Sequence, residues 1–249
     1  MQLPWWKDQP KAAYFKNNNM DLFANADWVS ARISEYLQVG VIRQVNLEDM
    51  HCCLPLKVVV TGATQKKRLI WVGCYVNDFI KIVKFHYETI QQFLTMLQRD
   101  DYLGKVDAAS GYHTIRIHTQ FQKFLGFSWG GRFYVYQVLP FGMNVAPLIY
   151  TVVILQLTKF WRRNSLLAYR GIQYLDDGSW ASRSMQQWFR VAFTVILTVQ
   201  DCGFWLGLDK CSLDPVCALD VIEFWINTKI MIITLPEKRN KRSQITSIL

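Results

Sequence analysis

An α+β fold is predicted for this sequence from three of its features. Apolar residues make up 51% of the 249 residues, which is enough to form a sizeable buried core. Runs of β-branched and aromatic residues occur in pairs about short turns, which is the pattern of β-hairpins. Between these pairs lie segments in which apolar residues recur at helical spacing. Hairpins that interleave with helices are typical of an α+β domain.

The first hundred residues predict a hairpin between two helices. Asp27 is placed to cap a helix over Trp28–Gln38, and Gly40 is placed to end it. Leu54–Thr61 and Lys67–Val72 are β-rich runs about a Thr-Gly-Ala-Thr turn. A second helix follows, marked by apolar residues at i, i+3, i+4 and i+7 spacing: Ile90, Phe93, Leu94 and Leu97.

The central residues predict two short strands and a hairpin. Tyr102–Val106 is a short β-rich run, and Thr114–His118 alternates polar with apolar residues. Leu125–Trp129 and Arg132–Val138 flank a Gly-Gly pair, which is a signal for a tight hairpin loop.

Two helices and two hairpins are predicted in the remaining residues. Ala146–Trp161 has a helical pattern, and a proline is tolerated in its first turn. Ser184–Cys202 is a longer amphipathic helix, which Gly203 is placed to terminate. The hairpins are formed by Ile172–Leu175 with Ser179–Ala181, about Asp-Asp-Gly, and by Val221–Ile226 with Ile230–Leu235, about Asn-Thr-Lys.

The net charge and the cysteine content limit which partners and which cellular compartment are expected. The formal net charge is +9, so an anionic partner is expected, although charge alone does not separate nucleic acid from a membrane surface. The six cysteines form no Cys-x-x-Cys pair, which argues against a zinc site and favours reduced thiols in an intracellular protein, cytoplasmic or nuclear. The uncharged run 133–158 is long enough to span a bilayer, but prolines and a glycine divide it, so no membrane span is expected.

Two adjacent carboxylates, Asp176 and Asp177, are the first candidates for chemistry. They lie in Tyr-Leu-Asp-Asp-Gly, where a hairpin turn lets both acids approach one spot. Crowded carboxylates repel one another unless a cation offsets their charge, and a hard divalent ion such as Mg²⁺ suits oxygen donors. An ordinary solvated turn has the same composition and is the alternative interpretation.

Asp107 supplies a third carboxylate, at the end of the predicted strand 102–106. Three carboxylates from two strand ends could chelate two metal ions about 3.5–4 Å apart, the arrangement used for in-line phosphoryl displacement. In isolation, a helix N-cap is the simpler interpretation of Asp107. The sequence contains neither a P-loop nor a Gly-x-Gly-x-x-Gly dinucleotide motif.

From about Asp27 to Arg239 the sequence resembles the reverse transcriptase family, in four motifs that occur in the family's order. The motifs are Asp107 with Tyr112, Leu139-Pro140-Phe141-Gly142, Tyr174-Leu175-Asp176-Asp177, and Gly203-Phe204 followed by Lys210. The resemblance implies a right-hand polymerase with fingers and palm, in which an antiparallel palm sheet packs on helices and the thumb is absent or truncated. Leu-Pro-Phe-Gly, Tyr-Leu-Asp-Asp-Gly and Gly-Tyr-His are most similar to DIRS-type retrotransposons.

The resemblance also implies a role for each matching residue. The catalytic and metal-binding residues would be Asp107, Asp176 and Asp177, with two Mg²⁺ or Mn²⁺ ions. The residues in contact with the nucleotide would be Lys66, Arg68, Tyr112, Gly142 and Lys210. The primer grip would be formed by Phe224 and Trp225. The ring of Tyr112 would block a ribose 2′-hydroxyl and so select deoxynucleotides, which disfavours the further alternative of an RNA-directed RNA polymerase.

A domain layout and partners follow from the same resemblance. Residues 1–100 would be a fingers-like region with an N-terminal extension. Residues 101–235 would be the palm, with fingers elements partly interleaved, and residues 236–249 a basic tail at the start of a missing thumb. The partners would be an RNA or DNA template with its primer and deoxynucleoside triphosphates, and not a membrane. Thumb, RNase H or recombinase regions would lie elsewhere in a longer polyprotein.

Two departures from the family pattern leave an alternative function open. Family members commonly have Trp-Asp-x-Arg in the fingers strand, whereas this chain has Trp71-Val72-Gly73-Cys74, and the usual glycine of the primer-grip hairpin is absent. The expected function is RNA-directed DNA synthesis of retroelement origin. The alternative is a catalytically inactive retroelement relict or fragment that at most binds nucleic acid.

Overall fold

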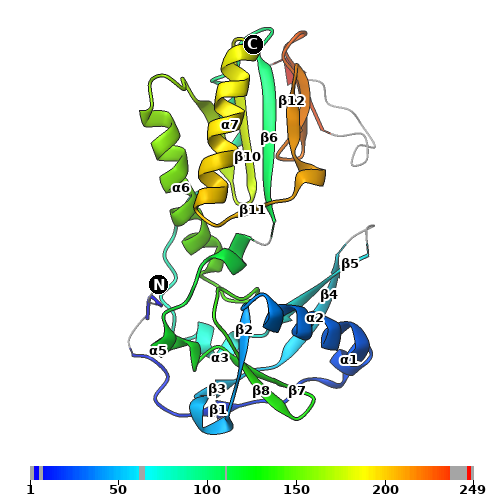
Figure 1. Ribbon diagram of the computed structural model, residues 1–249, viewed down its shortest axis with the longest axis vertical. Coiled ribbons are helices and arrows are strands. Elements are labelled where there is room, and N and C mark those ends of the chain that lie inside the picture. Colours follow the sequence, from blue (N-terminus) through cyan, green and yellow to red (C-terminus); the bar gives the residue numbers. More distant parts are fainter. Residues whose placement is uncertain (1–2, 6–7, 62–64, 110, 236–245, 248–249) are drawn as a thin grey trace. The chain divides into compact units, whose positions relative to one another are not determined.

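The computed structural model describes residues 3–5, 8–61, 65–109, 111–235 and 246–247 (Figure 1). The chain divides into two compact units, each built from two segments. The first unit contains Met1–Lys84 and Tyr112–Ile149, and the second contains Phe85–Gly111 and Tyr150–Leu249. The chain therefore interleaves the two units, while the assignment of fingers to 1–100 and palm to 101–235 stays a prediction. Of the expected basic tail, only residues 246–247 are among those described.

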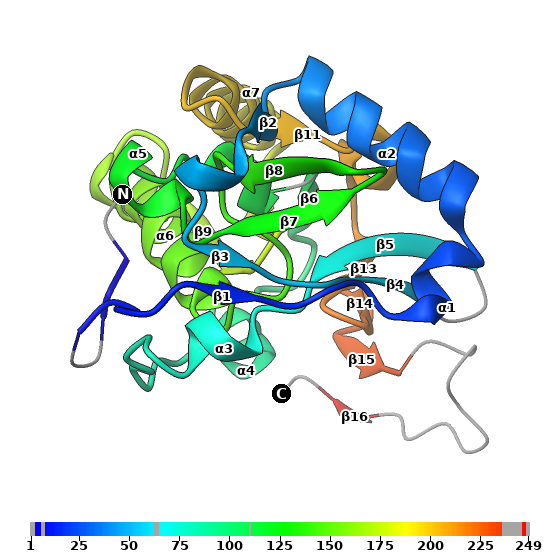
Figure 2. The same ribbon diagram turned by 90° about the horizontal axis from the view of Figure 1, so that it is seen from below.

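A five-stranded sheet organises the first unit, in the order β1-β3-β7-β8-β2 (Figure 2). Its strands are β1 (Tyr14–Phe15), β2 (Ile42–Val45), β3 (Cys52–Cys53), β7 (Gly126–Trp129) and β8 (Arg132–Tyr136). Gly130 and Gly131 join β7 to β8 at φ values of 57° and 72°, which confirms the predicted hairpin and its glycine loop. The other predicted hairpin of this unit is also present, as β4 (Leu56–Thr61) paired antiparallel with β5 (Lys66–Trp71).

Short helices surround this sheet, and two local predictions about them are wrong. The helical elements are α1 (Met20–Phe23), α2 (Ala26–Gln38), η1 (Leu47–Asp49), α3 (Cys74–Asn77), η2 (Gly111–Thr114) and α5 (Thr119–Gln122). Asp27 lies inside the first turn of α2 instead of capping it, because the helix already begins after Asn25. The segment 114–118 is not a strand: η2 includes Thr114, α5 begins directly after His118, and a single bridge joins Arg116 to Val138.

The second unit contains a five-stranded sheet in the order β11-β6-β10-β9, with β12 also paired to β6 (Figure 1). Its strands are β6 (Tyr102–Ala109), β9 (Arg170–Tyr174), β10 (Asp177–Ser182), β11 (Trp205–Leu206) and β12 (Ser212–Val216). All of these pairings are antiparallel, so the expected antiparallel palm sheet is present. β6 is longer than predicted and runs through Asp107, which therefore lies within a strand and is not the N-cap of a helix.

Three helices belong mainly to the second unit: α4 (Ile90–Leu94), α6 (Ala146–Arg163) and α7 (Met185–Asp201). The ends of α7 confirm the sequence prediction, since the Ser184 side chain accepts a bond from the Gln187 amide and Gly203 follows at a φ of 81°. None of the helices among the described residues is long and apolar enough to cross a membrane. All six cysteines are free thiols.

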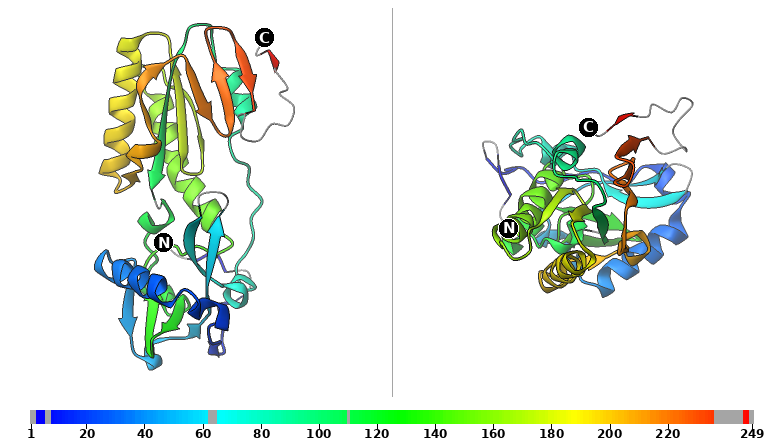
Figure 3. Two further views of the ribbon diagram at one scale, coloured as in Figure 1. Left: turned by 90° about the vertical axis from the view of Figure 1, so that its right-hand side faces the viewer. Right: turned by 90° about the horizontal axis from the view of Figure 1, so that it is seen from above.

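Successive side chains of the palm strands point to opposite faces of the sheet, and both faces are covered. On one face, Trp180 of β10 packs against Trp188 of α7, and the indole of Trp188 donates a hydrogen bond of 2.8 Å to the Leu103 carbonyl. Gly104 of β6 leaves room there, because a Cβ at this position would overlap the Trp180 ring. On the other face, which α4 and the strands of residues 218–234 cover (Figure 3), Leu103 and Ala181 join a buried cluster with residues of these elements.

A four-stranded sheet covers this second face, in the order β13-β14-β15-β16. Its strands are β13 (Ala218–Val221), β14 (Phe224–Asn227), β15 (Ile232–Thr234) and β16 (Thr246–Ser247). The prediction of one strand over Val221–Ile226 is wrong, because Ile222 and Glu223 turn the chain at φ values of 44° and 67°. Neither residue signals a turn, so burial of Val221 and Ile226 in the same cluster decides the backbone here.

Candidate active site

The register of the palm sheet brings the predicted carboxylates together. Asp177 on β10 lies directly opposite Asp107 on β6, as its Cα partner in the antiparallel pair. β9 and β10 are joined by a two-residue loop, Leu175 and Asp176, which is closed by the pairing of Tyr174 with Asp177. The sequence motif thus folds as a hairpin, as predicted, but its loop is Leu175 and Asp176 and not Asp-Asp-Gly, so Asp177 is the first residue of the returning strand.

Backbone hydrogen bonds hold these carboxylates in place. The amide of Ala108 donates to the Asp176 carbonyl at 2.9 Å, which ties the hairpin tip to β6. The amide of Gly207 donates to the Asp107 carbonyl at 2.9 Å, and the Asp107 amide donates to the Cys211 sulfur at 3.4 Å. The hairpin tip is therefore bonded to β6, and β6 is bonded in turn to the segment that follows β11.

Two lysines offset part of the negative charge at this site. Lys210 Nζ lies 2.7 Å from Asp107 Oδ1, and Lys105 Nζ lies 3.6 Å from Asp177 Oδ1. Lys105 stands two residues before Asp107 on the same face of β6, so strand alternation alone indicates that its side chain is close to the acids. Lys105 was not among the site residues predicted from the sequence. The positive charges are balanced against three carboxylates, so the site keeps an excess of negative charge.

The pKa values of both hairpin carboxyls are raised, and burial is the main cause. Burial, followed by the neighbouring charge of Asp107, raises the pKa of Asp176 above its ordinary value, although the side chain still reaches solvent. The pKa of Asp177 is raised by burial too, against the opposing effect of Lys105. The hydrogen bond to Asp107 raises the pKa of Lys210, so this lysine remains a cation. Such raised carboxyl pKa values indicate a site that gains from an additional cation.

The carboxylates suit a hard divalent cation, although they are not arranged as a closed cage. Across the described residues, no three His, Cys, Asp or Glu side chains are grouped closely enough to hold a metal ion as they stand. Asp107 Oδ1 is instead bonded to the Lys210 ammonium. The donors are nevertheless of the right kind, because Asp107, Asp176 and Asp177 offer oxygen ligands at one end of two paired strands.

Four of the predicted nucleotide-binding residues belong to the first unit, and only Lys210 belongs to the second. Lys66 and Arg68 lie on β5 with exposed side chains. Tyr112 lies in η2, with its ring 5.1 Å from that of Phe141. The roles of these residues remain predictions.

Gly142 lies against the end of β5 in the first unit. Its φ is 109°, and a Cβ at this position would overlap the Trp71 carbonyl oxygen. The Trp71 amide donates to the Phe141 carbonyl at 2.8 Å, and Asn77 Nδ2 donates to the Gly142 carbonyl at 2.9 Å. Only glycine therefore fits this loop as it stands. The sequence did not indicate that Asn77 bonds to this loop.

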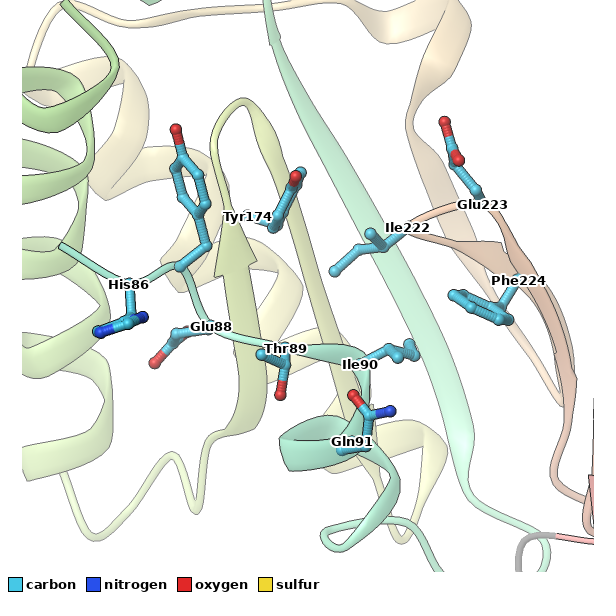
Figure 4. A pocket seen from close by; sticks show the side chains of 10 residues that line it. His86, Glu88, Thr89, Ile90, Gln91, Tyr174, Ile222, Glu223 and Phe224 are labelled. Atoms are coloured by element: carbon cyan, nitrogen blue, oxygen red, sulfur yellow. The ribbon is translucent and has the colours of Figure 1, made fainter. Parts of the chain in front are cut away.

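The predicted primer-grip residues, Phe224 and Trp225, begin β14 directly after the Ile222–Glu223 turn. Phe224 and this turn line a cavity of about 430 Å³. The other walls come from the segment 86–91 and from Tyr174 of the β9–β10 hairpin (Figure 4). This turn and the β9–β10 hairpin thus share one cavity of the second unit.

Residues 41–215 match the family model described as reverse transcriptase (RNA-dependent DNA polymerase). The chain is 25% identical over 186 residues to the retrovirus-related Pol polyprotein from transposon 297 of Drosophila melanogaster. It is 26% identical over 122 residues to a putative enzymatic polyprotein of Cassava vein mosaic virus. These alignments cover 74% and 47% of this chain, but only 17% and 19% of the two relatives.

Solved structures give the same grouping by fold. The foamy viral protease-reverse transcriptase in complex with double-stranded DNA matches with a TM-score of 0.77 and 18% identity, over 93% of this chain and 38% of that one. The same viral protein in complex with an RNA/DNA hybrid matches with a TM-score of 0.77 and 18% identity, over 95% and 30% of the two chains. At this identity the likeness concerns the fold, which agrees with the predicted fingers-and-palm architecture.

Proposed function

Because the chain belongs to the reverse transcriptase family, we propose that it copies a primed template into DNA with two Mg²⁺ or Mn²⁺ ions bound by Asp107, Asp176 and Asp177. The observation that carries this proposal is the register of the palm sheet, which places Asp177 opposite Asp107 and Asp176 beside it. When bound, such ions supply charge that activates a primer 3′-hydroxyl and neutralises the leaving pyrophosphate.

The side chains of the second unit would act by position and charge. The three aspartates would present oxygen ligands from a rigid sheet, which requires little rearrangement during the reaction. Lys210 would release Asp107 to the metal and turn its ammonium toward the triphosphate, whose negative charge attracts a cation. Lys105 would stay beside Asp177 and limit the net negative charge of the site.

Residues of the first unit would bind the incoming nucleotide. Arg68 and Lys66 are exposed on β5, where a guanidinium and an ammonium suit phosphate oxygens. Tyr112 would exclude a ribose 2′-hydroxyl, and the loop at Gly142 would lie beside the template base. Phe224 and Trp225, in the second unit, would contact the primer strand.

The partners proposed for this chain are a nucleic-acid duplex and deoxynucleoside triphosphates. The net charge of +9 favours an anionic ligand, and the foamy viral neighbours were solved with double-stranded DNA and with an RNA/DNA hybrid. We further propose a DIRS-type origin, an intracellular location and a longer polyprotein that carries the remaining regions. The small share of each relative that this chain covers agrees with the last point.

Primer extension on a poly(rA)/oligo(dT) hybrid, with Mg²⁺ or Mn²⁺, tests the proposal. The 249-residue chain should add nucleotides, and Asp176→Asn should abolish the addition while leaving the fold intact by circular dichroism. Asp214→Asn is a matched control, because Asp214 is an exposed aspartate of the same unit on β12. Equal activity in the chain and in Asp176→Asn would refute the assigned site. A folded chain that binds the hybrid without extending it would instead support the inactive relict.

Selection of the sugar tests the role of Tyr112 separately. Tyr112→Ala should raise the incorporation of ribonucleotides relative to deoxynucleotides, because the smaller side chain leaves room for a 2′-hydroxyl. Tyr112→Phe keeps the ring and should retain the preference of the parent chain. An unchanged sugar preference in Tyr112→Ala would remove Tyr112 from the nucleotide site.

A further inference from the structure

In the part of the chain that the structure describes, no further strand lies beside β9, the outer strand of the catalytic hairpin, in its sheet. In an antiparallel sheet, alternate residues of an edge strand point their backbone N–H and C=O groups away from the paired strand. Tyr174 pairs with Asp177 at the hairpin loop, so Gln173 and Gly171 are the residues whose backbone groups face outward. Without partners, these groups would leave the edge free to fray near the carboxylates.

An ion pair bonds to one outward-facing group of each residue, the N–H of Gln173 and the C=O of Gly171. Glu88 Oε2 accepts a hydrogen bond of 2.7 Å from the Gln173 amide, and Glu88 Oε1 accepts one of 2.6 Å from Arg162 Nη1. Arg162 Nη2 donates a third bond, of 2.6 Å, to the Gly171 carbonyl. Glu88 and Arg162 thus bond to two of the four backbone groups that a neighbouring strand would bond. Figure 4 shows Glu88 on the extended segment that runs beside this edge.

The pair is better sheltered than a typical surface ion pair. The side chains of Arg162 and Glu88 are 34% and 18% exposed, and each ion has a backbone partner in addition to the other. The ion pair of Arg32 with Glu35 in the first unit has a similar length, 2.7 Å, but its acid is 55% exposed. Charged hydrogen bonds with little access to water are stronger and more directional than exposed pairs.

Gln173 extends this contact to the tip of the hairpin. Its side-chain Nε2 donates a bond of 2.6 Å to the carbonyl of Leu175, whose φ is 50°. Gln173 is also the cross-strand partner of Gly178, where a Cβ would come within 2.8 Å of Gln173 Oε1. A continuous series of short contacts therefore leads from Arg162 through Glu88 and Gln173 to the residue that precedes Asp176.

We propose that Glu88 and Arg162 are positioning residues, which fix the edge of β9 and thereby hold Asp176 and Asp177 at the site. The proposal rests on the proposed polymerase function for its consequence in catalysis. Neither residue belongs to the hairpin, since Glu88 lies in the segment before α4 and Arg162 in the last turn of α6. They act on the reaction only through the hairpin, because their side chains bond to its outer edge.

Backbone hydrogen exchange of the Gln173 amide tests the contact without any need for activity. Glu88→Ala removes the acceptor, and exchange should become at least about tenfold faster, which is the loss expected for a hydrogen bond to a charged group. Glu88→Gln keeps one carbonyl acceptor and should recover most of the protection. Glu35→Ala, which removes the exposed ion pair in the first unit, should leave this amide unchanged. Equal exchange at Gln173 in all four proteins would overturn the proposal.

Nucleotide-addition kinetics test the consequence for the site. In Glu88→Ala the maximal addition rate should fall about tenfold, while the KM for the nucleotide should change less than twofold, because the proposed phosphate contacts are on β5. Glu88→Gln should restore much of the rate, and Glu35→Ala should match the parent chain. A rise in KM at constant rate would contradict positioning of the acids. If the parent chain adds no nucleotide but the exchange pattern holds, the polymerase proposal fails and the fixed hairpin edge stands.

Discussion

Replacing Gly142 by alanine should destabilise the first unit far more than an ordinary glycine replacement. The backbone at Gly142 has a φ of 109°, a conformation that costs a residue with a Cβ about 1–3 kcal/mol. The added Cβ would also overlap the Trp71 carbonyl oxygen and come within 2.9 Å of the Trp71 carbonyl carbon, which is backbone and cannot rotate away. The loop must therefore move away from β5.

The movement breaks two hydrogen bonds that fix the loop. These are the bond of 2.8 Å from the Trp71 amide to the Phe141 carbonyl and that of 2.9 Å from Asn77 Nδ2 to the Gly142 carbonyl. Each contributes about 1 kcal/mol to stability. Together with the backbone cost, we expect Gly142→Ala to lower the free energy of unfolding by about 3–5 kcal/mol, a large fraction of the about 5–15 kcal/mol typical of a domain.

Urea unfolding followed by tryptophan fluorescence measures this change. Gly130→Ala is the matched control, because Gly130 also has a positive φ, 57°, but no atom lies within 4 Å of a Cβ built there. The control should lose only about 1 kcal/mol, the cost of the backbone conformation alone. The reasoning is refuted if Gly142→Ala is no more destabilising than Gly130→Ala, since the close approach to Trp71 would then have no energetic consequence.

Three further changes have predictable effects on stability. Burial, with a smaller effect of Arg32, lowers the pKa of His113 from 6.5 to about 4. The free energy of unfolding should therefore fall by up to about 3 kcal/mol as the pH drops from 6.5 to 4. His113→Gln should remove that part of the pH dependence measured by urea unfolding. Asp101→Ala should cost about 3–5 kcal/mol in the same assay, because the buried carboxylate accepts bonds of 2.7 and 2.8 Å from Arg170, whose charge would lose its partner. Ala168→Gly should raise the free energy of unfolding by about 0.5–1 kcal/mol, and with it the melting temperature, because Ala168 has a φ of 43°.

Each of these predictions has its own contrary result. For His113, the sign follows from the folded chain binding the proton less readily than the unfolded chain, so a stability that rises toward pH 4 relative to His113→Gln would contradict it. For Asp101, Asp8→Ala is the control, because the pair of Asp8 with Lys11 is 67% and 82% exposed and should contribute little. Equal losses of unfolding free energy in the two variants would contradict a stabilising role for the buried pair. A lower melting temperature in Ala168→Gly would show that the backbone there is unstrained.

Local patterns in the sequence were sufficient for much of the fold. The Gly-Gly pair specified the β7–β8 hairpin, and Ser184 and Gly203 marked the ends of α7. The motif around Asp176 and Asp177 predicted a hairpin but not the position of its loop, which is Leu175 and Asp176 and not Asp-Asp-Gly. The pairing of that hairpin with the strand of Asp107 agrees with the two carboxylate sites that the sequence predicted, although their metal-binding role remains a prediction.

Other features were decided only by tertiary structure. The turn at Ile222 and Glu223 has no local signal and follows from burial of the residues on either side. Glu88 and Gln173 are 85 positions apart, and no spacing in the sequence indicates that one bonds to the other. The same holds for the approach of Gly142 to Trp71. Helix periodicity and turn preference act over a few residues, whereas these contacts depend on which distant segments pack together, and that is determined only when the whole chain has folded.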